Sequence, residues 1–298
     1  LERWLETRRP ALRTSTFRRY AALLRLHVIP HVGKRRLVGL QPDEVQRLYA
    51  TLGEKVVRAG KGRSAAAPAK LSARTVRHVH RALHAALQQA VIWRQLSRNV
   101  CDMVVPPLVL TPELRPPTPG QLAAFLRATE THPLRALWTL AVYTGARQGE
   151  LLGLKWSDLD LDVGTVTIQR SLTGVKAGIP TFGEPKTLRS RRTISIPRHA
   201  VEALREHRAK QLQHRLLLGP DCAPFDLVFC TTTGAPHWHS TVHRAFKTAL
   251  RQAGLPTSVR FHDLRHAHAT TMRRAGVDLK TVSERLGHAT IAITADLY

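Results

Sequence analysis

Residues 262–276 read HDLRHAHATTMRRAG, the most informative stretch of the sequence, and they are expected to form a helix. A helix that begins near His262 places His262 and Arg265 on one face, three residues apart. An arginine holds a phosphate through two parallel hydrogen bonds, and a histidine beside it accepts or donates a proton. The pair indicates a helical site that acts on a phosphoryl group, whereas His266 has the character of a packed structural histidine.

Two further segments carry residues suited to the same chemistry. In TGARQGEL, residues 144–151, Arg147 stands in a turn of small residues where a helix begins, and Glu150 is placed to orient a neighbour. Glycine in such a turn lets another backbone or a phosphate come close. In LGHATIAITADLY, residues 286–298, Gly287 is expected to cap a helix, so that His288 projects from the turn that leads to Tyr298.

The charge of the chain points to a polyanionic partner. The 298 residues correspond to about two domains, and 46 Lys and Arg against 21 Asp and Glu give a formal charge of +25. Residues 1–110 are the more basic part, with 21 basic and 6 acidic residues. This excess favours nucleic acid over a membrane surface. No apolar run reaches the ~18 residues that a spanning helix needs, so no membrane partner is expected.

Neither a metal nor another cofactor is expected. The chain has three cysteines, Cys101, Cys222 and Cys230. They lack metal-ligand spacing and fit a reducing compartment, the cytoplasm. A zinc site made from His262, His266 and His268 is disfavoured, because HExxH is absent and Arg265 would repel a cation at its centre.

The first part of the chain is predicted to be a helical domain over residues 1–105. Its helices are expected at 14–28, 42–52 and 72–96, with an exposed loop over 53–70. Valine, leucine and alanine stripes form the buried faces, and arginines lie beside them. The arginines predicted to contact DNA are Arg18, Arg19, Arg25, Arg74, Arg77 and Arg81. Six prolines in residues 103–119 predict an interdomain linker over 106–118.

The second part, residues 119–298, is predicted to be mostly helical with a small β insertion. Thr118 and Gln121 form the pattern of a capping box before the first helix. Helices are expected at 119–129, 133–144, 147–153, 198–217, 239–253, 262–274, 278–286 and 290–298. Strands are expected at 165–170 and 192–196, with Lys186 in the turn or strand between them. The fold class is therefore mainly α with a β-hairpin or small sheet.

The candidate residues occur in an order that resembles a known family. Arg147, Lys186, His262, Arg265, His288 and Tyr298 are similar in type and order to the site of the tyrosine recombinase, or phage integrase, family. The local matches are TGARQGEL, HDLRHAHATTMRRAG and LGHATIAITADLY. The basic N-terminal part, with HVIPHVGKRRLVGL at residues 27–40, resembles the core-binding domain of that family, so the resemblance covers nearly the whole chain.

The resemblance implies a reaction on DNA. Tyr298 would attack a phosphodiester and form a 3′-phosphotyrosine link, without metal or ATP. A 5′-hydroxyl of a partner duplex would then release the enzyme, and two such rounds would pass through a Holliday junction. The implied partners are double-stranded DNA with attachment-type sites, a homotetramer on DNA formed from free monomers, and accessory DNA-bending or directionality proteins. The implied location is the nucleoid of a bacterium or a phage-infected cell.

The resemblance also implies a role for each candidate. His262 would be the general base, and Arg147 and Arg265 would hold the non-bridging oxygens. His288 would add a phosphate contact, and Glu150 would steady His262 or an arginine. Lys186 would protonate the 5′-oxygen that leaves. The competing residue for this last role is Lys176, in SLTGVKAGIP.

Three other functions remain as alternatives. A type IB topoisomerase shares the tyrosine chemistry but relaxes supercoils, and a regulator without activity would only bind DNA. A metal-dependent nuclease would need clustered carboxylates, but Asp158, Asp160 and Asp162 of WSDLDLD are expected in a solvated turn and strand edge. Truncation is expected at both ends, since family members usually continue past the tyrosine with a docking helix and often begin with an arm-binding domain.

Overall fold

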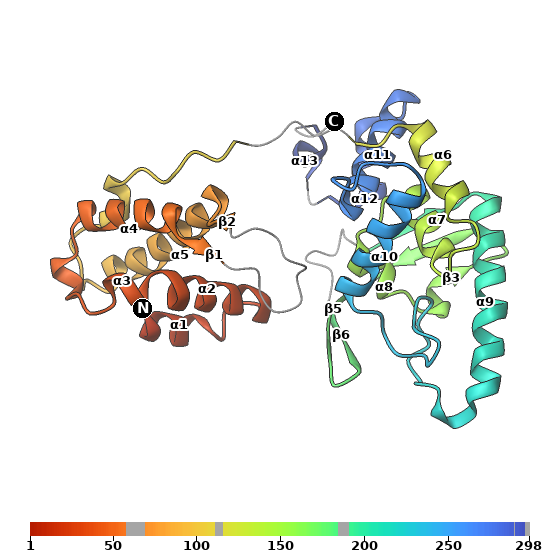
Figure 1. Ribbon diagram of the computed structural model, residues 1–298, viewed down its shortest axis with the longest axis horizontal. Helices are drawn as coiled ribbons and strands as arrows, with labels where there is room; N and C mark the ends of the chain where they lie inside the picture. The colour runs from red at the N-terminus through yellow and green to blue at the C-terminus, as the bar shows by residue number, and fades with distance from the viewer. Residues whose placement is uncertain (58–68, 111–115, 184–190, 289, 296–298) are drawn as a thin grey trace. The chain divides into compact units, whose positions relative to one another are not determined.

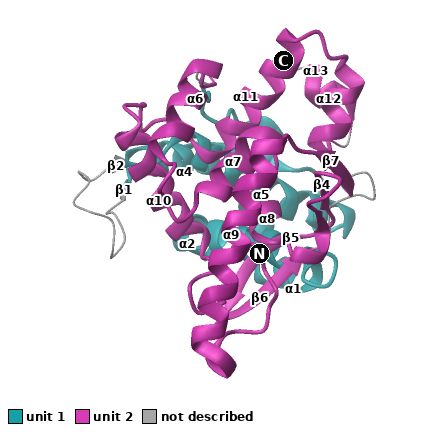
Figure 2. Ribbon diagram, turned by 90° about the vertical axis from the view of Figure 1, so that its right-hand side faces the viewer, with its two compact units in different colours: residues 1–113 teal, residues 114–298 magenta. Residues whose placement is uncertain are grey.

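The chain forms two compact units. The computed structural model describes residues 1–57, 69–110, 116–183, 191–288 and 290–295. The units span Leu1–Glu113 and Leu114–Tyr298 (Figures 1 and 2), and each has a hydrophobic core of its own. The predicted linker, residues 106–118, contains this boundary, although its residues 111–115 are not described. The described part of the chain has no helix long and apolar enough to cross a membrane.

The N-terminal unit is a bundle of helices. Its helices are α1 (Glu2–Arg8), α2 (Thr14–His27), α3 (Ile29–Val32), α4 (Pro42–Glu54) and α5 (Ala73–Ile92), with two short 3₁₀ helices at Leu37–Gly39 and Val100–Met103. The predicted face of α5 is confirmed as buried: it comprises Val76, Val79, Leu83, Leu87 and Ala90. Ser72 begins α5, and its hydroxyl accepts a hydrogen bond from the Thr75 amide.

Three features of this unit differ from the prediction. Helix α1 was not predicted, yet Trp4 and Leu5 insert into the core. Helix α5 ends at Ile92 rather than at 96, because Arg94 adopts a left-handed conformation with φ 57°. The prediction of a loop over 53–70 is wrong at both ends of this range. Helix α4 continues to Glu54, and β1 (Val56–Val57) pairs with β2 (Ala69–Lys70).

The C-terminal unit is helical around a small sheet, which confirms the predicted fold class. Its helices are α6 (Pro119–Ala128), α7 (Arg135–Thr144), α8 (Gln148–Leu152), α9 (Arg198–Leu218), α10 (His239–Gln252), α11 (Phe261–Arg274), α12 (Leu279–Leu286) and α13 (Ile291–Ala295). The capping box of Thr118 and Gln121 is confirmed at the start of α6. Helix α7 is almost entirely buried and contacts both α9 and α11 (Figure 1), so it forms the centre of the unit.

The strands form two separate antiparallel groups. Strands β3 (Leu159–Asp160), β4 (Thr165–Ile168) and β7 (Arg192–Ser195) form one sheet, in which Val166 pairs with Ile194. The second group, β5 (Ser171–Lys176) and β6 (Ile179–Gly183), was not predicted. Its two-residue turn has positive φ at Ala177 and Gly178, as suits a tight hairpin.

Candidate active site

The first part of the site is the junction between α7 and α8. Gly145 caps the C-terminal end of α7 in a left-handed conformation with φ 61°. A Cβ at this position would lie 2.9 Å from Leu286 Cδ2. Arg147 is the N-cap of α8. Its amide donates to Glu150 Oε2 at 2.8 Å, and its Nη1 donates to Glu150 Oε1 at 2.7 Å. The Arg147 side chain remains 42% exposed, so a ligand can reach its guanidinium from solvent.

Glu150 is shared between two arginines. Arg192 Nη2 donates to Glu150 Oε2 at 2.8 Å, and both side chains are buried. Burial by itself would raise the pKa of Glu150, but the charges and hydrogen bonds of Arg192 and Arg147 outweigh burial and lower this pKa to about 2. Glu150 is therefore ionised at neutral pH. Of the two roles predicted for it, the structure supports the steadying of an arginine.

Arg265 lies between the ends of two helices. It is 2% exposed, and its Nη1 and Nη2 donate to the carbonyls of Gly145 and Leu286 at 3.0 and 2.7 Å. These carbonyls stand at the C-terminal ends of α7 and α12, where helix carbonyls have no intrahelical partner and the helix dipole favours a cation. The local fold thus fixes the guanidinium in one orientation.

His262 stands one turn before Arg265 on α11, as predicted. Its ring meets the ring of buried His266 edge to face, with 4.9 Å between centroids, and His266 has the structural character expected of it. Partial burial, and then His266 and the charges of Arg265 and Arg147, lower the pKa of His262 to about 4. The residue still has exposed surface. His262 is therefore a neutral base that a substrate can reach.

His288 extends the same positive environment. Gly287 caps α12 with φ 67°, as predicted, and the next residue, His288, forms a 2.7 Å hydrogen bond between its Nδ1 and Thr294 Oγ1. Burial, and then the charges of Arg265 and Arg147, lower the pKa of His288 to about 4. Arg265 bonds to Gly145, two residues before Arg147, and to Leu286, two residues before His288, so the structure brings Arg147, His262, Arg265 and His288 into one site.

Two of the predicted site residues, Lys186 and Tyr298, lie outside the described residues. Their predicted roles therefore stay predictions. Lys176, the competitor of Lys186, is described and lies exposed at the end of β5, beside the hairpin turn.

Sequence reasoning missed two arginines of this site, Arg192 and Arg285. Arg285 Nε donates to His268 Nε2 at 3.1 Å, and its Nη2 donates to the carbonyls of Tyr143 and Ser195 at 3.1 and 2.8 Å. Both arginines contact residues far away in the sequence, so no local spacing marks them. The one available signal, which concerns Arg192 alone, was the arginine pair that opens RRTISI, a predicted strand in which isoleucines alternate with polar residues.

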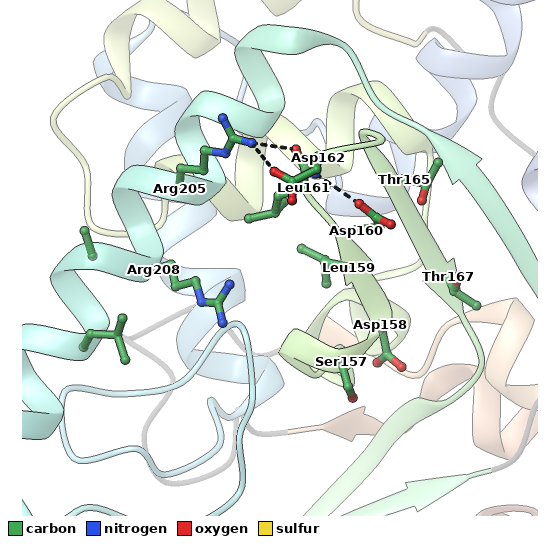
Figure 3. A pocket seen from close by; sticks show the side chains of 12 residues that line it. Ser157, Asp158, Leu159, Asp160, Leu161, Asp162, Thr165, Thr167, Arg205 and Arg208 are labelled. Atoms are coloured by element: carbon green, nitrogen blue, oxygen red, sulfur yellow. Dashed lines mark hydrogen bonds and ion pairs between the residues drawn. The ribbon is translucent and has the colours of Figure 1, made fainter.

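The carboxylates of WSDLDLD do not form a metal cluster. The prediction of a solvated position is wrong for Asp158, which is 4% exposed because Gln169, Arg170 and the Lys155 amide all donate to it. Asp160 and Asp162 are exposed beside a cleft of about 700 Å³ between the sheet and α9 (Figure 3).

Each of these two exposed carboxylates has a partner of its own. Asp160 accepts from the turn amides of Asp162 and Val163, and Asp162 pairs with Arg205 at 2.7 Å (Figure 3). Within the described ranges, no group of three or more His, Cys, Asp or Glu is placed to hold a metal ion.

The six arginines predicted to contact DNA are all exposed in the N-terminal unit. Arg19 and Arg81 line a groove of about 350 Å³ between α2 and α5, together with His78. Partial burial and the charges of these arginines lower the pKa of His78. Arg25 differs from the others, because it forms a two-pronged ion pair with Glu2 at 2.9 and 2.7 Å.

The site and the fold together define a class of protein. A group of arginines and histidines on a helical unit with a small antiparallel sheet fits the tyrosine recombinases. The signature of the Phage integrase family matches residues 118–298, and that of the phage integrase N-terminal SAM-like domain matches residues 1–53. The chain belongs to the phage integrase family and is a tyrosine recombinase, a DNA strand-exchange enzyme.

Named relatives agree with this assignment. A tyrosine recombinase XerC-like protein of Caldanaerobacter subterraneus is 32% identical over 99% of this chain and 76% of its own length. An integrase of Streptomyces ambofaciens is 30% identical over 91% of this chain and 68% of its own.

Solved structures share the fold. The Tn1549 transposon integrase in complex with transposon right end DNA superposes with a TM-score of 0.81, at 20% identity over 99% of this chain and 93% of that one. A lambda integrase tetramer bound to a Holliday junction gives 0.66, at 19% identity over 97% of this chain and 76% of that one. At such identities the likeness concerns the fold alone.

Proposed function

We propose that the chain is the integrase of a phage or another mobile element, and that it cuts and rejoins double-stranded DNA at attachment-type sites through a phosphotyrosine at Tyr298. The observation that carries this proposal is Arg265, locked between two helix ends one turn after His262 on the same helix. A fixed cation and a neutral base on one helix face are what the attack of a phenol on a phosphodiester requires.

In the first step, the Tyr298 oxygen forms a bond to phosphorus while the bond from phosphorus to the 5′-oxygen breaks. His262 takes the phenol proton, because a phenol with an ordinary pKa near ~10 is a weak nucleophile at neutral pH. Lys186 gives a proton to the 5′-oxygen. Arg147, Arg265 and His288 hold the non-bridging oxygens, and one such donor is commonly worth about 2.7–4 kcal/mol.

The second step reverses the first on a partner duplex. The incoming 5′-hydroxyl attacks the 3′-phosphotyrosine and releases the tyrosine, so no cofactor has to supply energy. Two rounds of exchange pass through a Holliday junction held by a homotetramer that assembles on DNA from monomers. The lambda integrase tetramer on a Holliday junction, whose fold this chain shares, supports this assembly. Accessory DNA-bending or directionality proteins and a place at the nucleoid belong to the same proposal.

Covalent trapping tests the central step. The protein is incubated in EDTA with nicked duplexes drawn from the sequence flanking its gene, and adducts that resist SDS are counted beside those of Tyr298→Phe. We expect an adduct with the native chain and none with the variant. Tight binding without an adduct would favour the DNA-binding regulator, and relaxation of supercoils without joined products would favour the topoisomerase.

The choice between Lys186 and Lys176 has its own test. A duplex with sulfur in place of the scissile 5′-oxygen has a leaving group that needs no proton. We expect Lys186→Ala to cleave the oxygen substrate slowly and the sulfur substrate at the native rate, while Lys176→Ala cleaves both normally. The opposite pattern would assign the acid to Lys176.

A further inference from the structure

Arg192 connects two parts of the phosphate site, namely the pair of Arg147 with Glu150 and the C-terminal end of α12. It begins β7, where it pairs with Ile168 of β4, so its backbone is fixed by the sheet. Its side chain is 6% exposed. Nη2 donates to Glu150 at 2.8 Å, and Nε donates to the Arg285 carbonyl at 2.7 Å.

Both acceptors adjoin arginines that hold the phosphate in the proposed reaction. Glu150 is also bound by Arg147, and the Arg285 carbonyl immediately precedes the Leu286 carbonyl that holds Arg265. The backbone there leaves room only for glycine, since a Cβ on Gly287 would lie 2.8 Å from Arg192 Nη1. One side chain therefore contacts Glu150, which holds Arg147, and the residue next to Leu286, which holds Arg265.

The charges of this cluster give Arg192 a second consequence. Arg147 and Glu150 alone would form a neutral pair, and the carboxylate would offset the charge of Arg147. With Arg192 on the other carboxylate oxygen, two cations share one anion, and the cluster keeps one positive charge. Because Arg192 is buried and Arg147 is 42% exposed, this charge is available to a phosphate at Arg147.

We propose that Arg192 is a positioning residue for strand cleavage. Its positive charge offsets the negative charge of the Glu150 carboxylate, which still orients the guanidinium of Arg147. The net positive charge of the cluster then remains available to the scissile phosphate. This inference rests on the proposed function. Arg192 acts through Arg147 and does not touch DNA.

A double-mutant cycle on single-turnover cleavage of a nicked duplex tests the proposal. Arg192→Gln is expected to slow cleavage by ~10²-fold, the cost of a small misplacement of a reacting group. Arg147→Gln alone should cost ~10²–10³-fold, as for other lost phosphate or oxyanion donors. In the Arg192→Gln background, however, Arg147→Gln should cost less than ~10-fold, because coupled residues are not additive.

A matched background separates positioning from general effects. Arg198→Gln removes an arginine whose ion pair with Glu202 lies on the surface, so Arg147→Gln should keep its full cost there. Rates are compared on folded protein at saturating DNA. Where Arg192→Gln does not fold, Arg192→Lys replaces it, because lysine keeps the charge but cannot serve both acceptors with a planar fork.

Each outcome decides the matter. An equal cost of Arg147→Gln in the native and Arg192→Gln backgrounds, or native cleavage by Arg192→Gln, overturns the positioning role and leaves the proposed function intact. An absence of adduct with the native chain overturns both. The proposal is supported if Arg147→Gln slows cleavage much less in the Arg192→Gln background than in the native and Arg198→Gln backgrounds.

Discussion

The arginines of the two units differ in how the protein holds them. In the N-terminal unit the six candidate arginines are exposed, and the ion pair of Arg25 with Glu2 is itself about half exposed. In the C-terminal unit, Arg265 and Arg192 are buried, and backbone carbonyls or Glu150 fix their guanidinium groups. Exposed arginines can contact a phosphate backbone at many positions, whereas a guanidinium fixed like that of Arg265 suits one phosphate in one geometry.

The largest difference should appear between Arg265 and Arg18. Arg265→Gln is expected to slow cleavage by ~10²–10³-fold, because it removes a fixed phosphate donor, and it also leaves two buried carbonyls without their partner. Arg18→Gln should weaken DNA affinity but leave the cleavage rate at saturating DNA within a few-fold of native. Single-turnover rates with both variants measure this. Similar rates for the two would remove the distinction between the units.

The buried ion pair should make the protein sensitive to acid. The pKa of Glu150 is lowered from 4.5 to about 2 in the folded protein, so its stabilisation is fully present above pH 4.5 and is lost as the pH falls toward 2. The shift corresponds to roughly 3 kcal/mol. Chemical denaturation of the native chain and Glu150→Gln measures it. The difference in unfolding free energy should shrink below pH 4.5, and a constant difference would contradict the assignment.

Two glycines separate backbone strain from contact with Arg192. Gly287 and Gly254 both have φ 67°, but a Cβ on Gly254 would meet nothing within 4 Å. Each change to alanine should cost about 1–2 kcal/mol for the left-handed conformation. Gly287→Ala should cost more and also slow cleavage, because it displaces Arg192. Unfolding free energies and cleavage rates check this. Equal effects of the two changes would mean that the Arg192 side chain can move away from the added Cβ without loss of stability or cleavage rate.

The smallest effects are expected in the N-terminal unit. If about ten cations neutralise phosphates, log affinity should fall with log salt with a slope near −9. Arg81→Gln should reduce this slope by about one. Arg25→Gln should reduce the slope less, because Arg25 already forms an ion pair with Glu2. Titrations across a range of salt concentrations measure both. A larger change for Arg25 would show that the ion pair opens when DNA binds.

The sequence predicted those parts of the molecule that depend on local spacing. His262 and Arg265 share a helix face because they are three residues apart, and the apolar stripe of α5 follows the same periodicity. Arg192 was missed because its partner Glu150 is 42 residues away. The β5–β6 hairpin was missed because its strands are mostly half-buried and show no regular alternation of buried and exposed residues. Asp158 was misplaced because it is buried beneath donors that lie more than ten residues later in the chain, Gln169 and Arg170, between β4 and β5.

The bonds of Arg265 also bear on the order of events during synthesis. Its bond to Gly145 closes a loop of 120 residues, and its bond to Leu286 needs a helix that leaves the ribosome after α11. Domains fold as units as the chain emerges, the N-terminal one first. A growing chain therefore exposes its basic N-terminal helices before the bonds that fix Arg265 can form. In the life of each molecule, the capacity to hold a polyanion comes earlier than the capacity to cut one.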